Sequence, residues 1–407
     1  MKLLFLANRT PYPPYRGDKL KIYNLARQLS AHHELHLLTF AQSEEDERHI
    51  PELKKYFTEV HLVPLPFKHS LWQCVLGLFS PKPFQVSYFH AKAMQQKLQE
   101  WIQIHQYDAV HIQHIRMAPY MQSYTHIPRI LDLPDAFSLY WQRRVEQSNN
   151  FIQKIALQWE QRRLYAYESI ISQFPLTLVC SEEDLSYLQQ KHPDARIALL
   201  PNGVDLDTFR PREHNYTIED TVLFTGNMDY APNVDAVVYF VHEIFPEIRK
   251  RRPGVKFIIA GQRPVDKVKA LASEDITITG FVQDLVDVYH QASVVVSPLR
   301  FGAGTQNKVL EAMALGIPVV CSHIGFKGLG IQSGEGAFLA TNKDEFVAQV
   351  TQLLADQSLR REMGSQGIQQ IEERFGWTII AQRLEGYFQQ VAHQAPVSDK
   401  HPETQGL

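Results

Sequence analysis

The chain of 407 residues is too long for one ordinary domain and long enough for two. Hydrophobic residues make up 44% of it and charged residues 21%, which is typical of a soluble globular protein. The formal net charge of -3 argues against nucleic acid as a partner, and three widely separated cysteines form neither a metal-binding pattern nor an even disulfide set.

The N-terminal half alternates short apolar runs with amphipathic segments. Seven runs have the length and composition of buried strands: KLLFLA (2–7), LHLLTF (35–40), VHLVPL (60–65), DAVHIQ (108–113), RILDL (129–133), LTLVCS (176–181) and RIALLP (196–201). Helix-like segments lie between them, for example 19–30 and 91–105, and residues 137–172 also have helical periodicity. This alternation predicts a parallel sheet covered on both faces.

Two features of the N-terminal half bear on location. The first apolar run is too short for a signal peptide, and no stretch of about 20 apolar residues is long enough to span a membrane. We therefore expect a cytoplasmic protein. The run SLWQCVLGLF (70–79), close to Lys68 and Lys82, predicts a helix in the core or between domains, with peripheral contact to the inner face of the plasma membrane as the alternative.

The alternation stops at the polar, turn-rich stretch 201–220, which we interpret as an interdomain linker. It restarts with the predicted strands TVLFTG (221–226), VKFIIAG (255–261), ITITGF (276–281), SVVVSPL (293–299) and PVVCS (318–322), and with a helix over 233–250. The restart predicts two similar doubly wound α/β domains, 1–203 and 204–373.

A helical segment ends the chain. Its last predicted helix, about 376–392, has the sequence WTIIAQRLEGYF, which is too apolar to stand free, so we expect it to pack back on the first domain. Residues 393–407 are polar and predict a disordered tail.

Several strands of the second half end in a glycine or a small polar residue: Gly226, Gly261, Gly280 and Ser297. Ligands of doubly wound sheets bind at the carboxyl edge of the strands. A single such glycine is usually only a turn, but this repetition favours a ligand that lies close to the backbone.

Residues 300–320, RFGAGTQNKVLEAMALGIPVV, predict a loop, a helix and a strand. Gly302 and Gly304 allow tight turns and a close approach to a ligand, and Thr305 is placed to cap the helix. The N-terminus of that helix offers free N–H groups and a partial positive charge, which suit an anion.

Lys308 and Glu311 lie on one face of this predicted helix. The lysine can meet a phosphate, and the carboxylate can accept two hydrogen bonds from a ribose diol. The structural alternative is an exposed ion pair worth only about 0.2–0.5 kcal/mol. The buried helix, glycine stop and strand that follow favour a nucleotide-diphosphate site instead.

Other nucleotide and metal chemistries are disfavoured. No G-x-G-x-x-G follows a predicted strand, which argues against a dinucleotide oxidoreductase. His111 and His114 lie in HIQH without a matching carboxylate or histidine motif, so we read them as strand-end residues and predict no metal site.

At these residues the sequence resembles a known family. The segment GAGTQNKVLEAMALGIPVV is similar to the donor-site signature of the retaining GT-B glycosyltransferases, which include glycogen-synthase-like and mannosyltransferase-like enzymes. The segments LPNGVDLDTF, VKFIIAGQRP, ITITGFVQDLVDVYHQASVVVSPLR and FGWTIIAQRLEGYF follow the family order, and PYPPYRGDKLKIYNLARQLS resembles its acceptor-domain loop and first helix. Within the group the chain is most similar to bacterial sugar transferases of exopolysaccharide systems.

The resemblance implies a GT-B fold, in which two Rossmann-like domains enclose a cleft, with the acceptor on the N-terminal domain and the donor on the C-terminal one. It implies transfer of a sugar from a nucleotide-diphosphate sugar to a glycan or lipid-linked acceptor, with retention and without a metal or other cofactor. Two alternatives remain at this point: a non-hydrolysing nucleotide-sugar epimerase, and a GT-B protein that binds nucleotide or glycan without activity.

The resemblance also implies roles for individual residues. Glu311 would hold the ribose and Lys308 the phosphate, and together with His114 and Gln113 they form the expected catalytic set. Expected donor contacts are Gly226, Asn227, Gly261, Arg263, Gly280, Phe281, Val282, Arg300, Gly302, Gly304 and Thr305. Expected acceptor-side residues are Arg16, Gly17, Asp18, His111 and Asp135.

The sequence departs from the family pattern at three places. Ala303 stands where many members have a second glutamate that touches the donor sugar. Asn227 and Asn233 stand where many have a basic pair, and Gln113 replaces the second histidine of His-x-His. We expect Arg263, Arg300 and Lys308 to supply the missing positive charge.

Overall fold

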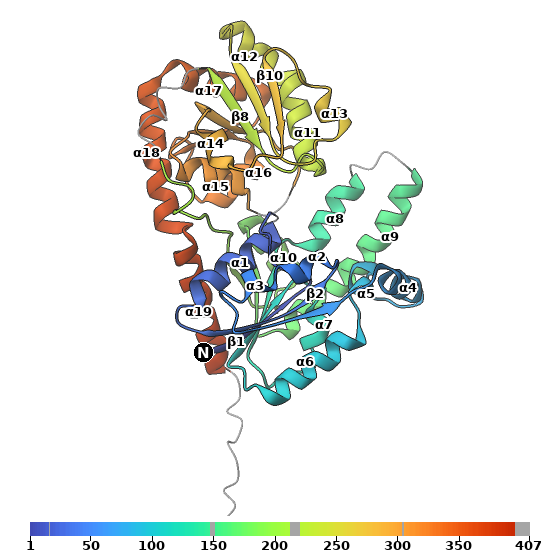
Figure 1. The fold of residues 1–407 in the computed structure, drawn as a ribbon. Helices are drawn as coiled ribbons and strands as arrows, with labels where there is room; N and C mark the ends of the chain where they lie inside the picture. The colour runs from blue at the N-terminus through green and yellow to red at the C-terminus, as the bar shows by residue number, and fades with distance from the viewer. Residues whose placement is uncertain (16, 147–150, 212–219, 303–304, 395–407) are drawn as a thin grey trace, which may run out of the picture. The chain divides into compact units, whose positions relative to one another are not determined.

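The computed structural model describes residues 1–15, 17–146, 151–211, 220–302 and 305–394 (Figure 1). They form two compact units. The first unit contains 1–180, 184–200 and the chain from Ala381 onward, and the second contains 181–183 and 201–380. The transition between the units therefore lies at Leu200 and Pro201, within three residues of the boundary expected from the sequence.

The first unit is built on a seven-stranded parallel sheet with the order β3-β2-β1-β4-β5-β6-β7. Its strands are β1 (Lys2–Ala7), β2 (Glu34–Ala41), β3 (Glu59–Pro64), β4 (Ala109–Gln113), β5 (Arg129–Leu133), β6 (Leu176–Val179) and β7 (Ile197–Leu199). Each of the strands predicted in this half is confirmed. The central strand β1 pairs Phe5 with Leu37 on one side and with His111 on the other.

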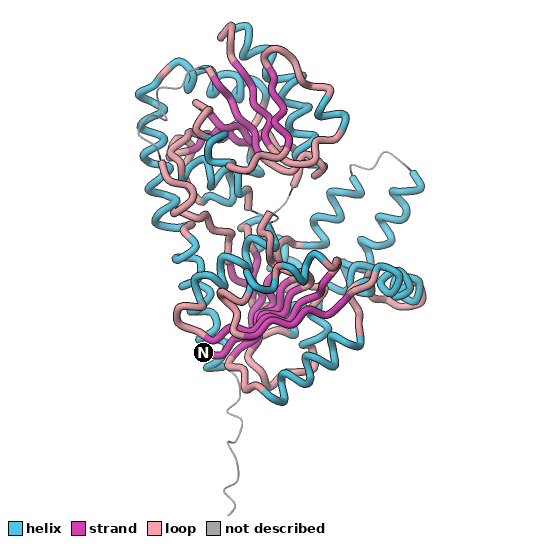
Figure 2. The backbone as a smooth tube through the Cα atoms, viewed as in Figure 1, coloured by secondary structure: helices cyan, strands magenta, loops and turns pink. Residues whose placement is uncertain are grey.

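Helices cover both faces of this sheet (Figure 2). They are α1 (Gly17–Leu29), α2 (Glu45–Arg48), α3 (Ile50–Leu53), α4 (Phe67–Gly77), α5 (Phe84–Tyr88), α6 (Lys92–Ile104), α7 (Ala118–Met121), α8 (Phe137–Glu146), α9 (Phe151–Tyr167), a 3₁₀ turn (Glu168–Gln173) and α10 (Glu182–Lys191). In α6, the spacing of Met94, Leu98 and Trp101 puts all three in the core, as an amphipathic helix requires.

The second unit contains a six-stranded parallel sheet with the order β10-β9-β8-β11-β12-β13. Its strands are β8 (Thr221–Thr225), β9 (Lys256–Ala260), β10 (Ile276–Gly280), β11 (Val294–Ser297), β12 (Val319–Cys321) and β13 (Ala337–Leu339). All are confirmed predictions except β13, which was not predicted. Its three residues lie at the edge of the sheet and pair only with β12.

The helices of the second unit include one departure from prediction. They are α11 (Ala231–Tyr239), a π-helical turn (Phe240–Ile244), α12 (Phe245–Arg251), α13 (Asp266–Lys269), α14 (Leu285–Tyr289), α15 (Asn307–Ala314), α16 (His323–Phe326), a 3₁₀ turn (Lys327–Leu329), α17 (Lys343–Ala355) and α18 (Gln357–Arg374). The helix predicted over 233–250 is divided by the π-turn, because Pro246 has no N–H to continue the α-helical ladder.

Alternate residues of β8 belong to different cores. Val222 and Phe224 pack with the core that includes α11, α12 and α17, whereas Leu223 packs with the core of α15. The sheet is therefore buried on both faces, which explains why its strands read as continuous apolar runs rather than as alternating patterns.

The strand order reverses at one place in each sheet, between β1 and β4 and between β8 and β11. At such a point the loops after the two central strands run in opposite directions and leave a crevice at the carboxyl edge. In the second unit, α15 follows β11 directly along the chain, so its N-terminus lies at this edge.

Helix α19 (Trp377–Gln394) is the last described element. Phe388 is fully buried with its ring centroid 6.4 Å from that of His111, and the Tyr387 hydroxyl donates to the Leu199 carbonyl at 3.1 Å. These contacts belong to the first unit, which contains the helix from Ala381. Because the helix runs to Gln394, residues 393 and 394 are not part of a disordered tail, and the rest of the expected tail lies outside the described residues.

The structure also bears on the run at 70–79. It forms most of α4, and Leu71, Trp72 and Phe79 are 53%, 60% and 91% exposed, so the prediction of a core helix is wrong. Within the described ranges, no helix is both long and apolar enough to traverse a bilayer.

Candidate functional site

The start of α15 is held by Asn202. Its backbone N–H donates to the Thr305 hydroxyl at 3.4 Å, and its side-chain amide donates to Asn307 Oδ1 at 3.1 Å. The N-cap residue is Gln306, whose side chain makes no capping hydrogen bond, so the prediction that Thr305 caps this helix is wrong. The Thr305 hydroxyl accepts the hydrogen bond from the Asn202 backbone.

Lys308 is a buried lysine, only 8% exposed. Its Nζ donates to Asn233 Oδ1 at 2.8 Å and lies 4.3 Å from the centre of the Phe224 ring. Burial lowers the pKa of Lys308 from its ordinary value to about 7, an effect that the charge of Glu311 only partly opposes. A buried ammonium held by a neutral amide is costly, so the solvated Lys–Glu pair considered from the sequence is wrong for Lys308.

Glu311 has a partner of its own. Its Oε2 accepts a hydrogen bond from the Tyr289 hydroxyl at 2.8 Å, and the same hydroxyl lies 2.8 Å from the Thr225 hydroxyl. Burial raises the pKa of Glu311 above its usual value, with Tyr289 and Lys308 acting in the opposite direction. Lys308 and Glu311 thus lie on one helix but are positioned by different elements. Asn233, in the first turn of α11, holds Lys308, and Tyr289, at the end of α14, holds Glu311.

The glycines at the strand ends have a packing reason. Gly226 and Gly261 have φ angles of 152° and 151°, which favour glycine. A Cβ at Gly261 would lie 1.7 Å from the Gly226 carbonyl oxygen, and a Cβ at Gly226 would lie 2.5 Å from Asn233 Nδ2. The loops after β8 and β9 are therefore pressed together, and this contact positions the amide that holds Lys308.

An amide network stands where the family resemblance leads one to expect a basic pair. Gln262 Nε2 donates to Asn227 Oδ1 at 2.7 Å, and Asn233 Nδ2 donates to the Asn227 carbonyl at 3.0 Å. With its other amide atom, Asn233 accepts from Lys308. The network links the ends of β8 and β9 to α15 and leaves Lys308 as its cationic member.

The two arginines expected to supply charge have carboxylate partners. Arg300 forms a bidentate pair with Asp235, with Nε 2.8 Å from Oδ2, and its guanidinium lies 4.8 Å from the Tyr239 ring centre. This pair raises the pKa of Arg300. Arg263 Nη1 lies 3.4 Å from Asp229 Oδ2, and its side chain is 70% exposed.

The remaining donor-side residues border this region. Gly280 and Gly302 have positive φ angles of 68° and 146°, Phe281 is 61% exposed, and Val282 packs against the core of α15. Gly304 and the departure at Ala303 lie outside the described residues.

In the first unit, a buried charge cluster lies at the ends of β4 and β5. Asp132 Oδ2 is 3.0 Å from His111 Nε2, and Asp132 Oδ1 accepts from Lys21 Nζ at 2.7 Å. Lys21 also donates to the Leu200 carbonyl at 2.9 Å. Burial opposes the charge of Asp132, but Lys21 and His111 outweigh it and hold the pKa of that carboxyl below its usual value.

The other acceptor-side residues lie around the ends of β1 and β4. Gln113 Nε2 donates to the Asp18 carbonyl at 2.5 Å, and Gly17 begins α1. His114 has a φ of 77° and an edge-to-face contact with Phe137 at 4.8 Å. Burial lowers the pKa of His114 well below its usual value, so the imidazole is neutral at pH 7. Arg16 lies outside the described residues.

Family models match both units. Residues 22–208 match the model described as Glycosyltransferase Family 4, and residues 219–356 match the model described as Glycosyl transferases group 1. The fold is similar to that of Anabaena HepE in complex with UDP and glucose, with a TM-score of 0.68, 16% identity and coverage of 96% of this chain and 100% of that one. The chain belongs to the GT-B glycosyltransferases. The resemblance to GT-B glycosyltransferases and the two Rossmann-like domains expected from the sequence are thereby confirmed.

Curated relatives of this GT-B glycosyltransferase match only part of their own length. A GDP-mannose-dependent alpha-(1-6)-phosphatidylinositol monomannoside mannosyltransferase of Mycobacterium tuberculosis is 26% identical over 51% of this chain and 60% of its own. The capsular polysaccharide biosynthesis glycosyltransferase CapM of Staphylococcus aureus is 27% identical over 36% of this chain and 42% of its own. The match thus spans about half the length of these relatives.

Asp135 lies in an acidic cluster in the first unit. Its carboxyl, Cys180 Sγ and a carboxyl oxygen of Asp184 all lie within 4.8 Å of one another. Burial, the charge of Asp184 and that of Asp18 raise the pKa of Asp135 to about 7. At neutral pH this carboxyl is therefore partly protonated and can donate as well as accept a proton.

A second cluster of potential metal ligands contains His36, Glu59 and His105. Both ring nitrogens of His36 have partners, since Nδ1 lies 2.9 Å from the Tyr107 hydroxyl and Nε2 lies 3.1 Å from Glu34. These hydrogen bonds account for the position of His36 in β2, and we therefore assign no ion to the cluster.

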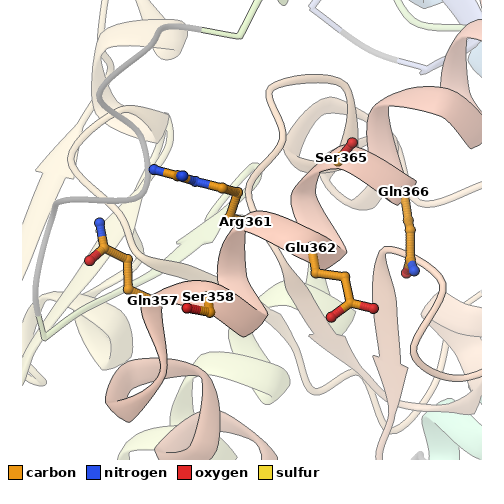
Figure 3. A pocket seen from close by; sticks show the side chains of 6 residues that line it. All are labelled: Gln357, Ser358, Arg361, Glu362, Ser365 and Gln366. Carbon is orange, nitrogen blue, oxygen red and sulfur yellow. The ribbon is translucent and has the colours of Figure 1, made fainter.

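A surface depression of about 460 Å³ lies along α18 (Figure 3). Its lining residues all come from this helix: Gln357, Ser358, Arg361, Glu362, Ser365 and Gln366. None of the residues expected to bind a nucleotide is among them, and one helix alone cannot enclose a nucleotide. We therefore place the candidate donor site at α15.

Proposed function

We propose that this GT-B glycosyltransferase is a retaining enzyme that transfers a sugar from a nucleotide-diphosphate sugar to a glycan or lipid-linked acceptor in bacterial polysaccharide biosynthesis. The observation that carries the proposal is Lys308, a buried cation with an amide partner, on the same helix as Glu311 at the strand-order reversal of the second unit. An anionic ligand would compensate the charge of such a lysine better than its neutral amide partner does. The similarity to the capsular polysaccharide biosynthesis glycosyltransferase CapM and to HepE in complex with UDP and glucose supports a polysaccharide role and a UDP-containing donor.

In the proposed reaction, Lys308 and the N–H groups at the start of α15 bind the diphosphate, and Glu311 binds the ribose. The sugar–phosphate bond breaks as the acceptor hydroxyl attacks from the same face, and the departing diphosphate takes the hydroxyl proton. Negative charge then accumulates on the leaving group, where Lys308 stabilises it. The asparagine network would orient Lys308 towards the diphosphate without neutralising its charge.

Metal independence follows from this assignment as a prediction. If Lys308 and the helix N-terminus neutralise the diphosphate, a chelator such as EDTA should leave the transfer rate unchanged. A loss of activity on chelation that Mg²⁺ or Mn²⁺ restores would show that a metal ion compensates the charge of the diphosphate instead.

We place the reaction in the cytoplasm, with a lipid-linked acceptor drawn from the inner face of the membrane.

Glu311→Gln should weaken nucleotide-diphosphate affinity at least as much as it slows transfer. The ribose contact is the same in the ground state and the transition state, so its loss raises Kd and KM alike. We expect about tenfold to 100-fold weaker binding by calorimetry, the range for a hydrogen bond to a charged group. Tyr289→Phe is a matched control that removes only the positioning hydroxyl and should have a smaller effect. Unchanged affinity in Glu311→Gln would remove this residue from the donor site.

Nucleotide affinity should fall as pH rises above about 7. Lys308 has a pKa of about 7 without ligand, and a bound diphosphate favours its charged form, so binding takes up a proton above that pH. The dissociation constant should rise by up to about tenfold per pH unit. In Lys308→Arg the guanidinium stays charged and the dependence should flatten. An identical pH profile in the two proteins would contradict the assignment.

The function is tested by incubating the protein with UDP- and GDP-sugars and following the anomeric proton by NMR. We expect slow donor hydrolysis or transfer whose first product keeps the donor's anomeric configuration. Exposed Lys250→Ala, in the same unit, serves as a control and should keep full activity. An inverted product would overturn retention, interconversion of sugars without release of nucleotide would indicate an epimerase, and donor binding without turnover would indicate an inactive binder.

A further inference from the structure

Helix α4 buries small residues and exposes large apolar side chains, which is the reverse of an ordinary surface helix. The residues that face the domain are small: Ser70 and Gly77 are buried, and a Cβ at Gly77 would lie 2.8 Å from Ser87 Oγ. The large apolar side chains point to solvent, with Phe67 68% exposed and Phe79 91% exposed. The intervening members of this face, also exposed, are Leu71, Trp72, Val75, Leu76 and Leu78.

The first three turns of α9 repeat this arrangement. Phe151, Ile152, Ile155 and Trp159 are 77%, 79%, 51% and 40% exposed. Their spacing of one, four and eight residues places them on one side of the helix. The buried side of α9 begins only at Leu157 and Glu160. Together the two helices expose a number of large apolar side chains that is unusual for a surface without a ligand.

Buried polar contacts clamp the two apolar helices into one surface. Glu160 of α9 accepts from the backbone N–H groups of Phe84 and Gln85, at the start of α5, which packs against α4, at 3.1 and 3.2 Å. Arg163 donates to the carbonyls of Gly77, Ser80 and Lys82, which end α4 and begin the following turn.

Aromatic stacking completes the clamp. The guanidinium of Arg163 lies 4.7 Å from the Phe84 ring centre and 4.4 Å from that of Trp159, and these two rings are 5.1 Å apart. The buried carboxylate of Glu160 thus holds the helices together and adds no exposed negative charge to the surface.

The charges in the helices and turn that make up this surface are mostly positive. Lys68 and Lys82 flank α4, no aspartate or glutamate lies between them, and the exposed part of α9 carries Lys154. Lys68 and Lys82 are exposed at the start of α4 and just beyond its end. Aromatic and aliphatic side chains flanked by lysines are typical of segments that lie in the interface of an anionic membrane.

We propose that α4 and the first three turns of α9 form a membrane-docking surface, which inserts its apolar side chains among the lipids of a bilayer with anionic headgroups. The clamp of Glu160 and Arg163 makes it a preformed surface, so binding requires no refolding. The proposal stands independently of sugar transfer, because lipid binding needs neither donor nor acceptor. A neutral protein partner would gain nothing from the lysines, which favours the anionic bilayer as occupant.

The test is co-sedimentation of the full chain with vesicles of phosphatidylcholine alone or mixed with phosphatidylglycerol. We expect binding to the mixed vesicles that weakens in high salt, and weaker binding to phosphatidylcholine. The double changes Trp72→Ser with Phe79→Ser, and Phe151→Ser with Ile152→Ser, should each weaken it by about tenfold or more, since each removes two large apolar side chains that the bilayer would cover. Ile104→Ser, which alters an equally exposed residue on α6, should bind like wild type.

The melting temperature of each variant verifies that it remains folded, as expected for exposed positions. Lack of binding to the anionic vesicles, or wild-type binding by both double variants, would overturn the proposal. So would analytical ultracentrifugation that shows a dimer in wild type and monomers in the double variants, because a second copy would then be the occupant. Retained vesicle binding in Lys308→Met would show that docking is independent of the donor site.

Discussion

Replacing Lys308 with methionine should reduce sugar transfer by about 100- to 1000-fold, the usual cost of removing one group that stabilises a charged leaving group. The same change should raise the stability of the protein. Methionine fills a similar volume without a charge, and replacing a poorly compensated buried ion with an apolar side chain is commonly stabilising by about 1–4 kcal/mol. The melting temperature should therefore rise by about 2–4 °C for each kcal/mol gained.

The pH dependence of this gain has a definite sign. The pKa of Lys308 is lowered to about 7 in the folded protein, whereas in the unfolded chain it has its ordinary value. Between these values the unfolded chain binds the extra proton, so the stability of the wild type rises with pH above about 7. The advantage of Lys308→Met should be largest below pH 7 and shrink as the pH is raised.

Melting curves across this pH range, together with transfer rates at pH 7, test the prediction. Lys250→Met, at a side chain that is 69% exposed, is a matched control with little expected change in either property. A Lys308→Met protein that is active, or that loses activity only because it melts at a lower temperature, would mean that this lysine has a structural role.

Asp132→Ala should have the largest effect on folding of the changes considered. It leaves Lys21 charged and buried with the Leu200 carbonyl as its remaining acceptor among the described residues, and it removes the Asp132 partner of His111. Breaking a buried ion pair on one side typically costs about 3–5 kcal/mol. For a domain of this size the melting temperature should fall by about 6–20 °C.

The acid sensitivity of the wild type follows from the same cluster. The pKa of Asp132 is depressed in the folded protein, so its stabilising effect is present above the unfolded value and is lost as the pH falls through the folded one. The Asp132→Ala variant should lack this loss of stability at low pH. The double change Lys21→Met with Asp132→Leu, which removes both charges, should recover most of the stability in urea unfolding. Equal destabilisation in the single and double variants would show that packing, not the ion pair, matters here.

The strands were predictable because parallel strands covered on both faces must be continuous apolar runs, and β1 and β8 are clear examples. The edge strand β13 has only three residues, of which Phe338 and Leu339 are partly exposed, so its sequence carries little signal. The division of the 233–250 helix depends on where the backbone tolerates Pro246, which periodicity alone does not fix.

The candidate site was predictable only where it is local in sequence. Lys308 and Glu311 lie within one helix and follow a glycine-containing loop, so their pattern is visible. Their partners are not, because Asn233 and Tyr289 come from elements 75 and 22 residues away. Lys21 and Asp132, which are 111 residues apart, were missed for the same reason.

From the sequence, an exposed α4 was only the alternative to a helix in the core or between domains. An apolar run with helical spacing fits a buried helix as well as an exposed one, and the choice depends on which side docks. Here the small residues Ser70 and Gly77 fit against the domain, which turns the larger ones to solvent.

The central claim, that the face of α15 binds a nucleotide diphosphate, is tested most directly by calorimetric titration of UDP and GDP into wild type, Lys308→Met and Glu311→Gln. One of the two nucleotides should bind the wild type and stabilise it, by about 2.7 kcal/mol at 100 times its dissociation constant. Both variants should bind it at least about tenfold more weakly while remaining folded. Equal affinity in all three proteins, or no binding of either nucleotide to the wild type, would contradict the account.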